Sequence, residues 1–139
     1  MEFIEIEMKR KAIIISIKGY QLSKKEKLLL KHEKPWGLIL FKRNIGSLKQ
    51  IQQLIKTIRK LTKDKKFPIM IDEEGSSVSR LNKIINHNFS QKLLGDMYNF
   101  NPKICLSFYK NYINNLTRLL RKIGVNINTV PVLDVLRKN

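Results

Sequence analysis

The chain has 139 residues and a mass of 16.4 kDa, enough for one domain with a hydrophobic core, and its hydrophobic fraction of 42% excludes disordered and fibrous classes. Lys and Arg (28) exceed Asp and Glu (11), giving a formal net charge of +17. No apolar run approaches the roughly 18–20 residues that span a bilayer, and the acidic start (Glu2, Glu5, Glu7) is unlike a signal peptide. We therefore expect a cytoplasmic protein without a membrane partner.

The first third of the chain predicts a strand and then a helix. Residues 12–17 form a β-branched run ended by Gly19, which is typical of a strand buried on both faces. Ser23 and Glu26 have the spacing of a capping box, so a helix is predicted from there to about Glu33. The helix ends before Pro35, because the residue preceding a proline is disfavoured in the helical region.

A second strand, a second helix and a third strand follow. The apolar run 36–41 predicts the strand, and Ser47 with Gln50 forms the next capping box. Apolar residues at 3-4-3 spacing then give one stripe of a helix that ends near Leu61. Residues 67–72 predict the third strand, with a proline near its start, where a missing N–H donor is tolerated.

The remaining elements are a loop-rich stretch, a long helix and a fourth strand. Residues 75–100 look loop-like, with one short helix around 91–97. Asn101-Pro102 supplies an N-cap and a proline at the first helical position, and Gly124 provides the C-terminal stop. Residues 125–135 predict the fourth strand. Cys105, the only cysteine, excludes an internal disulfide and is interpreted as a small buried group of the long helix.

The alternation of strands and helices predicts an α/β fold with a parallel sheet and right-handed crossovers. Two architectures satisfy this order: an open doubly wound sheet, and part of an eight-stranded (β/α)8 barrel. Gly19 stands alone, and neither GxGxxG nor GxxxxGK occurs in the sequence. A nucleotide-binding doubly wound fold is therefore the less favoured of the two.

Polar residues follow the predicted strands, at the edge where both architectures place function. Within the triplet Asp72-Glu73-Glu74, alternation along a strand would put the first and third side chains on one side and Glu73 on the other. These carboxylates either neutralise nearby cations and fix the loop, or Asp72 accepts hydrogen bonds from ligand hydroxyls. A metal site is less favoured, because no histidine joins the carboxylates at a ligand-like spacing. The candidate residues at this edge are Lys42, Arg43, Asn44, Asp72, Glu74, Arg80 and Asp134.

Four segments match known motifs in the same order and at matching spacing. Residues 36–44 resemble GxILFxRN, residues 68–81 resemble D(Q/E)EGGxVxRL, residues 129–135 resemble xxAPVLDV, and residues 14–20 resemble xxISGxxL. Together they resemble the N-terminal domain of family 3 glycoside hydrolases of the bacterial β-N-acetylhexosaminidase type. The match covers nearly the whole chain.

This resemblance implies the N-terminal half of a (β/α)8 barrel and a retaining enzyme that removes terminal β-linked N-acetylglucosamine, as in peptidoglycan recycling from muropeptides. No metal or organic cofactor is expected. By position, Asp72 resembles the family's sugar-binding aspartate and Arg80 the arginine that lines the same pocket. Supporting roles at the barrel mouth fall to Lys42, Arg43, Asn44, Glu74 and Asp134.

The sequence departs from the family pattern in two respects. Ser76-Ser77 replaces a stretch that usually begins with glycine, a residue that allows a positive φ angle. The family's catalytic loops correspond to positions beyond Asn139, so we expect residues 8–139 to be a partial domain that is inactive alone, poorly stable and prone to self-associate through open sheet edges. Residues 1–7 precede the usual start near Met8 and are interpreted as a non-native extension.

Two alternatives stay open at this stage. One is a non-catalytic sugar-binding half-barrel that dimerises. The other is a basic α/β module that binds nucleic acid, which the net charge alone favours. Ile, Lys and Asn make up 52 of the 139 residues, a bias that AT-rich codons produce, and the sequence has neither an arginine cluster nor an interleaved aromatic platform. No specific nucleic-acid partner is therefore expected.

Overall fold

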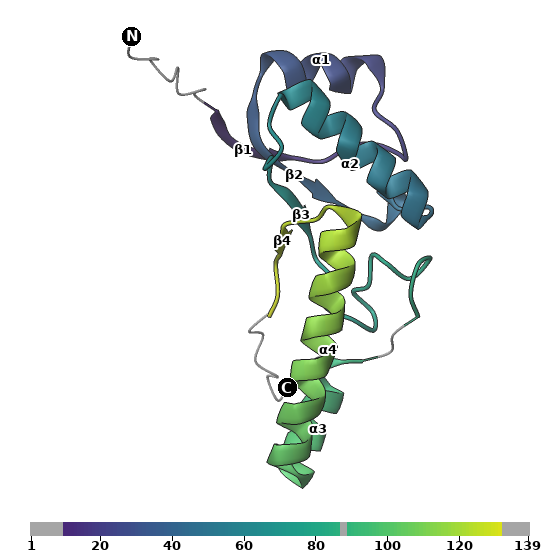
Figure 1. Ribbon diagram of the computed structural model, residues 1–139, viewed down its shortest axis with the longest axis vertical. Helices are drawn as coiled ribbons and strands as arrows, with labels where there is room; N and C mark the ends of the chain where they lie inside the picture. The colour runs from purple at the N-terminus through teal and green to yellow at the C-terminus, as the bar shows by residue number, and fades with distance from the viewer. Residues whose placement is uncertain (1–9, 87–88, 132–139) are drawn as a thin grey trace, which may run out of the picture.

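The computed structural model of the protein describes residues 10–86 and 89–131 and has the predicted alternation of strands and helices (Figure 1). The predicted extension 1–7 lies outside these residues. In chain order the elements are β1 (Lys11–Ile15), α1 (Lys24–His32), β2 (Pro35–Leu40), a short 3-10 helix η1 (Lys42–Asn44), α2 (Leu48–Thr62), β3 (Ile69–Ile71), α3 (Gln91–Phe100), α4 (Pro102–Ile123) and β4 (Ile127–Asn128).

The sheet has the strand order of a barrel segment. Within the described residues the strands are parallel and lie in the order β1-β2-β3-β4. The register places Leu38 beside Ile69 and Leu40 beside Ile71, so these side chains share one face of the sheet. Helices α1, α2 and α4 all contribute to the core on this face. A doubly wound sheet has helices on both faces, so the prediction of a (β/α)8 half-barrel is confirmed.

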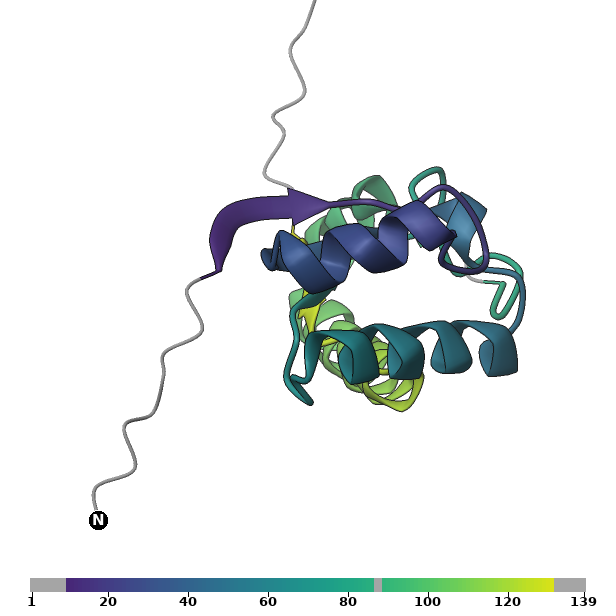
Figure 2. The ribbon, with the colours of Figure 1, turned by 90° about the horizontal axis from the view of Figure 1, so that it is seen from above.

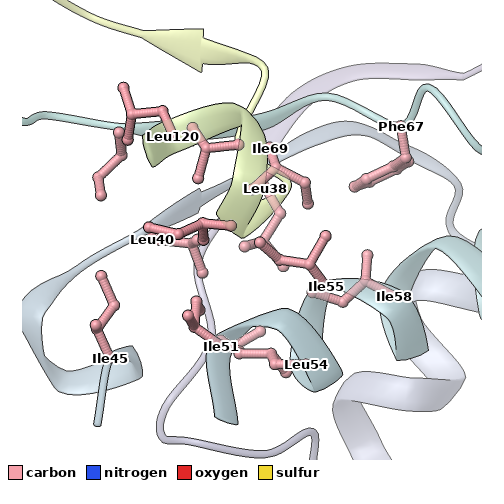
Figure 3. Close-up of a cluster of buried hydrophobic side chains, with 14 of the residues drawn as sticks. Leu38, Leu40, Ile45, Ile51, Leu54, Ile55, Ile58, Phe67, Ile69 and Leu120 are labelled. Atoms are coloured by element: carbon pink, nitrogen blue, oxygen red, sulfur yellow. The ribbon is translucent and has the colours of Figure 1, made fainter. Parts of the chain in front are cut away.

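The core lies between the sheet and these three helices (Figure 3). The apolar stripe predicted for α2 supplies the largest share of the helix contribution and faces the buried residues of β2 and β3. Burial of such side chains stabilises a fold by about 1.5–3 kcal/mol each. The labelled members of the cluster are Leu38, Leu40, Ile45, Ile51, Leu54, Ile55, Ile58, Phe67, Ile69 and Leu120.

Strand β1 differs from its prediction. It was expected to be buried on both faces, but Ile13 is 51% exposed and Ile14 is 44% exposed. The prediction is wrong because β1 is an edge strand that pairs only with β2 in the described part of the chain, and Ile14 lies on the sheet face opposite the helices. Ile17, just after the strand, is buried in the core instead.

The strand bounds are shorter than predicted at the third and fourth strands. β3 begins two residues after Phe67, and β4 is only Ile127–Asn128. Hydrogen bonds extend the β3–β4 pairing on both sides, because the Asn126 N–H donates to the Ile69 carbonyl and the Thr129 N–H donates to the Ile71 carbonyl. Residues 132–135 of the predicted fourth strand lie outside the described residues.

Helices α3 and α4 form a hairpin that projects away from the sheet (Figure 1). α3 extends to Phe100, beyond the predicted 91–97, because Asn101 ends it and caps α4 at the same position. None of its residues is buried. Cys105 is buried between the two helices, with its Sγ 3.4 Å from the Leu94 carbonyl, so its predicted packing role is confirmed.

The predicted capping residues are confirmed at the starts of α1, α2 and α4 and at the end of α4. The Ser23–Glu26 capping box is complete, and Gly124 ends α4 with φ of 104°. The Ser47 side chain accepts from the Gln50 N–H, but the predicted box is only half formed, because the Gln50 side chain accepts from the Gly46 N–H instead of that of Ser47. Among residues 10–86 and 89–131, no helix combines the length and the apolar character that a bilayer-spanning helix requires.

Candidate functional site

Asp72 and Arg80 meet at the carboxyl edge of the sheet. Asp72 directly follows β3, and its Oδ2 accepts from Arg80 Nη2 at 3.3 Å. Its other oxygen, Oδ1, accepts from the hydroxyl of Thr129, which directly follows β4. Both side chains are only partly buried, with exposed fractions of 23% for Asp72 and 24% for Arg80. The structure therefore joins the two predicted sugar-binding residues in one solvent-accessible pair.

An aromatic ring positions the cationic member of this pair. The guanidinium carbon of Arg80 lies 5.7 Å from the centroid of the Phe41 ring, and that of Arg43 lies 4.7 Å from the same ring. Both distances are within the range of cation–π attraction. Arg80 Nε is buried and has no hydrogen-bond partner among the described residues.

Glu73 anchors the loop that carries Arg80. It is 1% exposed, and its Oε2 accepts from the backbone N–H groups of Arg80 and Leu81 at 2.8 and 2.9 Å. The Asn128 side chain braces the Glu73 backbone, with its Oδ1 accepting from the N–H at 3.0 Å and its Nδ2 donating to the carbonyl. The middle carboxylate of the triplet thus fixes the loop and leaves Asp72 as the outward-facing acid.

A tight turn joins Glu73 to Arg80. The Val78 N–H donates to the Gly75 carbonyl, and the Glu74 N–H donates to the Val78 carbonyl, both at 3.1 Å. Gly75 has φ of 95° and Ser76 has φ of 49°. Ser76, which stands where the family motif has glycine, therefore adopts the left-handed conformation that glycine accommodates most easily.

The three residues after β2 have separate positions. Asn44 is fully buried: its Nδ2 donates to the carbonyls of Ile17 and Gly19 at 2.9 and 3.0 Å, and its Oδ1 accepts from the Phe41 N–H. Arg43 Nε donates to the Ile17 carbonyl at 3.0 Å. Both tie the β2 end to the β1 end. Lys42 is exposed, and its side chain has no hydrogen bond or ion pair within the described residues.

Glu74 takes no part in the contacts that join Asp72, Arg80 and Thr129. Glu73 is buried while Asp72 and Glu74 are half-buried, which agrees with the alternation predicted for residues 72–74. Glu74 and Glu73 line a cavity of about 180 Å³ beside α3 and α4, together with Tyr109 and Tyr112. Burial, followed by the charges of Glu73 and Tyr109, raises the pKa of Tyr112 above its ordinary value.

The remaining predicted site residue, Asp134, lies outside the described residues. Three residues that bear on the site were missed at the level of sequence: Phe41, Asn128 and Thr129. Asn126 and Asn128 offered a signal, since asparagine is depleted in strands and two residues at this spacing share a face. Both amides hold backbone groups of the neighbouring strand region, Asn126 around Ile69 and Asn128 around Glu73.

The arrangement is suited to binding hydroxyl groups. Asp72 provides acceptor oxygens, Arg80 provides planar donors, and Thr129 contributes a hydroxyl, all at one edge of the sheet. The described residues hold no group of three or more His, Cys, Asp or Glu side chains arranged for a metal ion.

Known proteins match both the sequence and the fold. No protein-family model matches the sequence, but individual proteins do. A β-hexosaminidase of Xanthomonas oryzae pv. oryzae is 29% identical over 127 residues, which is 91% of this chain and 38% of that protein. NagZ from Neisseria gonorrhoeae has a TM-score of 0.78 at 25% identity, over 91% of this chain and 37% of NagZ. The predicted resemblance to the N-terminal domain of family 3 glycoside hydrolases is thereby confirmed.

Two further structures extend the comparison. NagZ from N. gonorrhoeae in complex with N-trifluoroacetyl-D-glucosamine gives a TM-score of 0.71 at 26% identity, over 91% of this chain and 38% of that chain. A family 3 β-N-acetylglucosaminidase from Paenibacillus sp. shares the fold, with a TM-score of 0.74 at 24% identity over 88% of this chain and 23% of that one. The chain spans about 38% of the length of the curated relatives it matches. These matches do not favour the nucleic-acid-binding alternative.

Proposed function

We propose that residues 8–139 form the sugar-binding part of a glycoside hydrolase that removes terminal β-linked N-acetylglucosamine. The observation that carries this proposal is the Asp72–Arg80 pair at the carboxyl edge of the parallel sheet. In α/β barrels this edge is where ligands bind. The NagZ structure that contains N-trifluoroacetyl-D-glucosamine supports the choice of sugar, since that protein matches this chain in fold and sequence.

In this proposal Asp72 accepts hydrogen bonds from ring hydroxyls, and Arg80 keeps the carboxylate in place while it donates to the sugar. Thr129 and Phe41 hold the two side chains in position. Arg43, Asn44 and Glu73 are positioning residues, because each forms hydrogen bonds to backbone groups that hold neighbouring loops together. Lys42 and Glu74 are assigned supporting roles at the mouth, as is Asp134.

The bond-breaking chemistry is assigned to other residues than these. Glycoside hydrolysis uses two groups on opposite sides of the scissile bond. Glu73 is buried and accepts hydrogen bonds from loop amides, and Glu74 lines the cavity beside α4. Neither carboxylate is therefore assigned the position opposite Asp72 on the far side of a bound sugar. This chain alone therefore binds the sugar without hydrolysing it.

The proposed setting is the cytoplasm, where the substrate is a saccharide of the muropeptide kind and the process is peptidoglycan recycling without a metal or organic cofactor. The family resemblance supports this assignment. We further propose that the isolated chain associates with itself, since β1 and β4 each pair on one side only in the described residues and β1 carries exposed isoleucines.

The test is N-acetylglucosamine binding to the full chain, measured by ligand-observed NMR. Asp72→Ala is expected to lower affinity at least about tenfold, because a hydrogen bond from a neutral group to a carboxylate contributes about 1.5–3 kcal/mol. Asp96→Ala is the matched control, because Asp96 is exposed and, among the described residues, its side chain pairs only with Lys92. Equal affinity of the two variants would contradict the proposed site. Turnover of a chromogenic N-acetylglucosaminide by this chain would contradict its purely binding role.

A further inference from the structure

A groove on the helix side of the sheet is lined by cations. It lies between α1 and α2, which run side by side (Figure 2), and has a volume of about 680 Å³. Its charged lining residues are all lysines, which we call the groove lysines: Lys27 and Lys31 from α1, and Lys56, Lys60 and Lys63 from α2 and its C-cap. The other lining residues, Gln53, Thr57 and Leu61, are uncharged.

The protein does not neutralise these charges internally. Among the described residues, none of the groove lysines takes part in an ion pair or side-chain hydrogen bond. The nearest acids in sequence have other partners. Glu33 pairs with Lys11, Asp64 pairs with Arg10, and the Glu26 carboxylate accepts from backbone N–H groups. The groove therefore keeps an excess of positive charge that is available to an anion.

Helix stability does not account for this arrangement. Lysines in the last turn of a helix interact favourably with the helix dipole, and this applies to Lys31 and Lys60. Lys27 and Lys56 lie one turn earlier, where the dipole effect has fallen off. Each also stands four residues from the next groove lysine, and like charges at that spacing destabilise a helix by about 0.2–0.5 kcal/mol. The pattern thus opposes helix stability.

The groove continues at both ends, so its shape suits an extended ligand. A hollow of about 310 Å³ shares Lys27, Gln53 and Thr57 with it, and another of about 240 Å³ shares Lys31, Leu61 and Lys63. Three adjoining hollows along one helix seam form a continuous track. A single small anion would occupy only one of them.

We propose that this groove binds a linear polyphosphate chain. Lysine ammonium groups bind phosphates as point charges, and a row of them matches a polymer with a charge on every unit. The lysines follow one seam between two helices, so they form a single row that suits one linear chain. The 680 Å³ groove, which all five groove lysines line, has no aromatic lining residue. Each adjoining hollow has one: Phe67, which is only 1% exposed, and Tyr20, whose ring lies against Lys83. Single-stranded nucleic acid is held by successive aromatic side chains on which its bases stack, as well as by charge.

This site is independent of the proposed sugar site. The groove lysines near the helix C-termini, Lys31 and Lys63, lie at the amino-terminal end of the sheet, since each helix runs antiparallel to its strand. Asp72 and Arg80 lie at the carboxyl end. Polyphosphate and N-acetylglucosamine are therefore expected to bind together without competition.

The experiment measures binding of fluorescently labelled linear inorganic polyphosphate to the full chain by anisotropy at several salt concentrations. A chain that engages five lysines gives a log–log salt slope of about −3.5, at about 0.7 per neutralised charge. The variant K27Q/K56Q/K60Q is expected to flatten this slope by about 2 and to weaken binding on the order of tenfold at low salt.

The matched control is K25Q/K103Q/K110Q, which removes three exposed lysines outside the groove and gives the same net charge. It is expected to bind like the unmodified chain, and K27R/K56R/K60R is expected to retain binding. Far-UV circular dichroism checks that each variant is folded. Equal losses in the two glutamine variants would overturn the groove as the site. Tighter binding of a single-stranded oligonucleotide of equal charge would overturn the ligand class.

Discussion

Ser76 shows how one residue can hold a binding loop in a strained conformation. Its φ of 49° lies in the left-handed region, and the turn it forms connects Glu73 to Arg80. For a residue with a side chain this conformation costs roughly 1–2 kcal/mol. The site is nevertheless assembled, because Glu73 binds the far end of the loop through two backbone N–H groups.

Ser76→Gly is expected to raise the free energy of unfolding by up to about 1 kcal/mol, since relief of the left-handed strain exceeds the added entropy of glycine in the unfolded chain. Urea denaturation measures the change. Ser77→Gly is the control, because Ser77 is exposed and its φ is not positive. It is expected to lower stability slightly, and a gain as large as that of Ser76→Gly would refute the strain.

Two glycines in regular elements have opposite environments. A Cβ added to Gly37 in β2 would lie 2.9 Å from the Cβ of Pro68 and 3.1 Å from its carbonyl oxygen. This close approach lets β2 lie against the segment that leads into β3, where the Leu38 N–H donates to the Pro68 carbonyl. A Cβ added to Gly95 in α3 would meet nothing within 4 Å.

Gly37→Ala is therefore expected to destabilise the protein by about 1–3 kcal/mol through overpacking against backbone. Gly95→Ala is expected to stabilise it by about 0.5–1 kcal/mol, because alanine is the better helix former at an open position. Thermal unfolding of both variants measures the difference. A similar shift in the same direction for both would contradict the role of the Pro68 contact.

The capping box of α1 makes part of the stability depend on pH. Burial acts to raise the pKa of Glu26, but hydrogen bonds from the backbone N–H groups of Ser23 and Lys18, helped by the Ser23 hydroxyl, outweigh it and hold the pKa below its ordinary value. A carboxyl group with a depressed pKa contributes stability above the pKa of the unfolded chain. That stability is lost as the pH falls through the folded-state pKa.

Glu26→Gln is expected to reduce stability at neutral pH by about 1 kcal/mol, comparable to the loss of a helix cap. The difference from the unmodified chain should shrink in acid, since both carry an uncharged group there. The free energy of unfolding of the variant and of the unmodified chain, measured at neutral pH and at about pH 3, tests this expectation. Glu33→Gln, which removes an exposed ion pair with Lys11, is expected to have a smaller effect. A pH-independent deficit for Glu26→Gln would be inconsistent with the depressed pKa.

On the scale of the whole molecule, the sheet edge at β1 and the projecting hairpin are two of the places where the described residues expose apolar side chains. β1 exposes Ile13 and Ile14 along an edge that has no partner strand among residues 10–86 and 89–131, whereas Phe100, 90% exposed, lies where α3 meets α4. An open edge offers both hydrogen bonds and apolar contact to a second strand. The hairpin, where Tyr98, Ile104 and Leu106 are exposed as well as Phe100, offers apolar contact without free strand hydrogen bonds, because its backbone is helical. The edge is thus the expected site of self-association.

Ile13→Lys is expected to shift the sedimentation profile of the chain toward monomer, because a charged side chain on an edge strand opposes strand addition. Phe100→Lys adds the same charge at the hairpin and is expected to leave the profile unchanged. Analytical ultracentrifugation at matched concentrations distinguishes the two. If only Phe100→Lys reduced association, the interface would be the hairpin.

The sequence by itself determined the local features of this protein. Ser23, Ser47, Asn101 and Gly124 mark helix ends correctly, because a cap is completed by hydrogen bonds within a few residues of the chain. The apolar stripe of α2 was predictable in the same way, from the helical period of its apolar residues. The pairing of Asp72 with Arg80 was predictable because the two residues lie eight positions apart in a single motif.

Only the tertiary structure decided which groups meet across the sheet. Thr129 reaches Asp72 from 57 positions away, and Asn44 binds carbonyls of the loop after β1. The exposure of β1 depends on which strand is an edge. Strand pairing fixes these properties, and it joins segments whose separation along the chain leaves no local pattern.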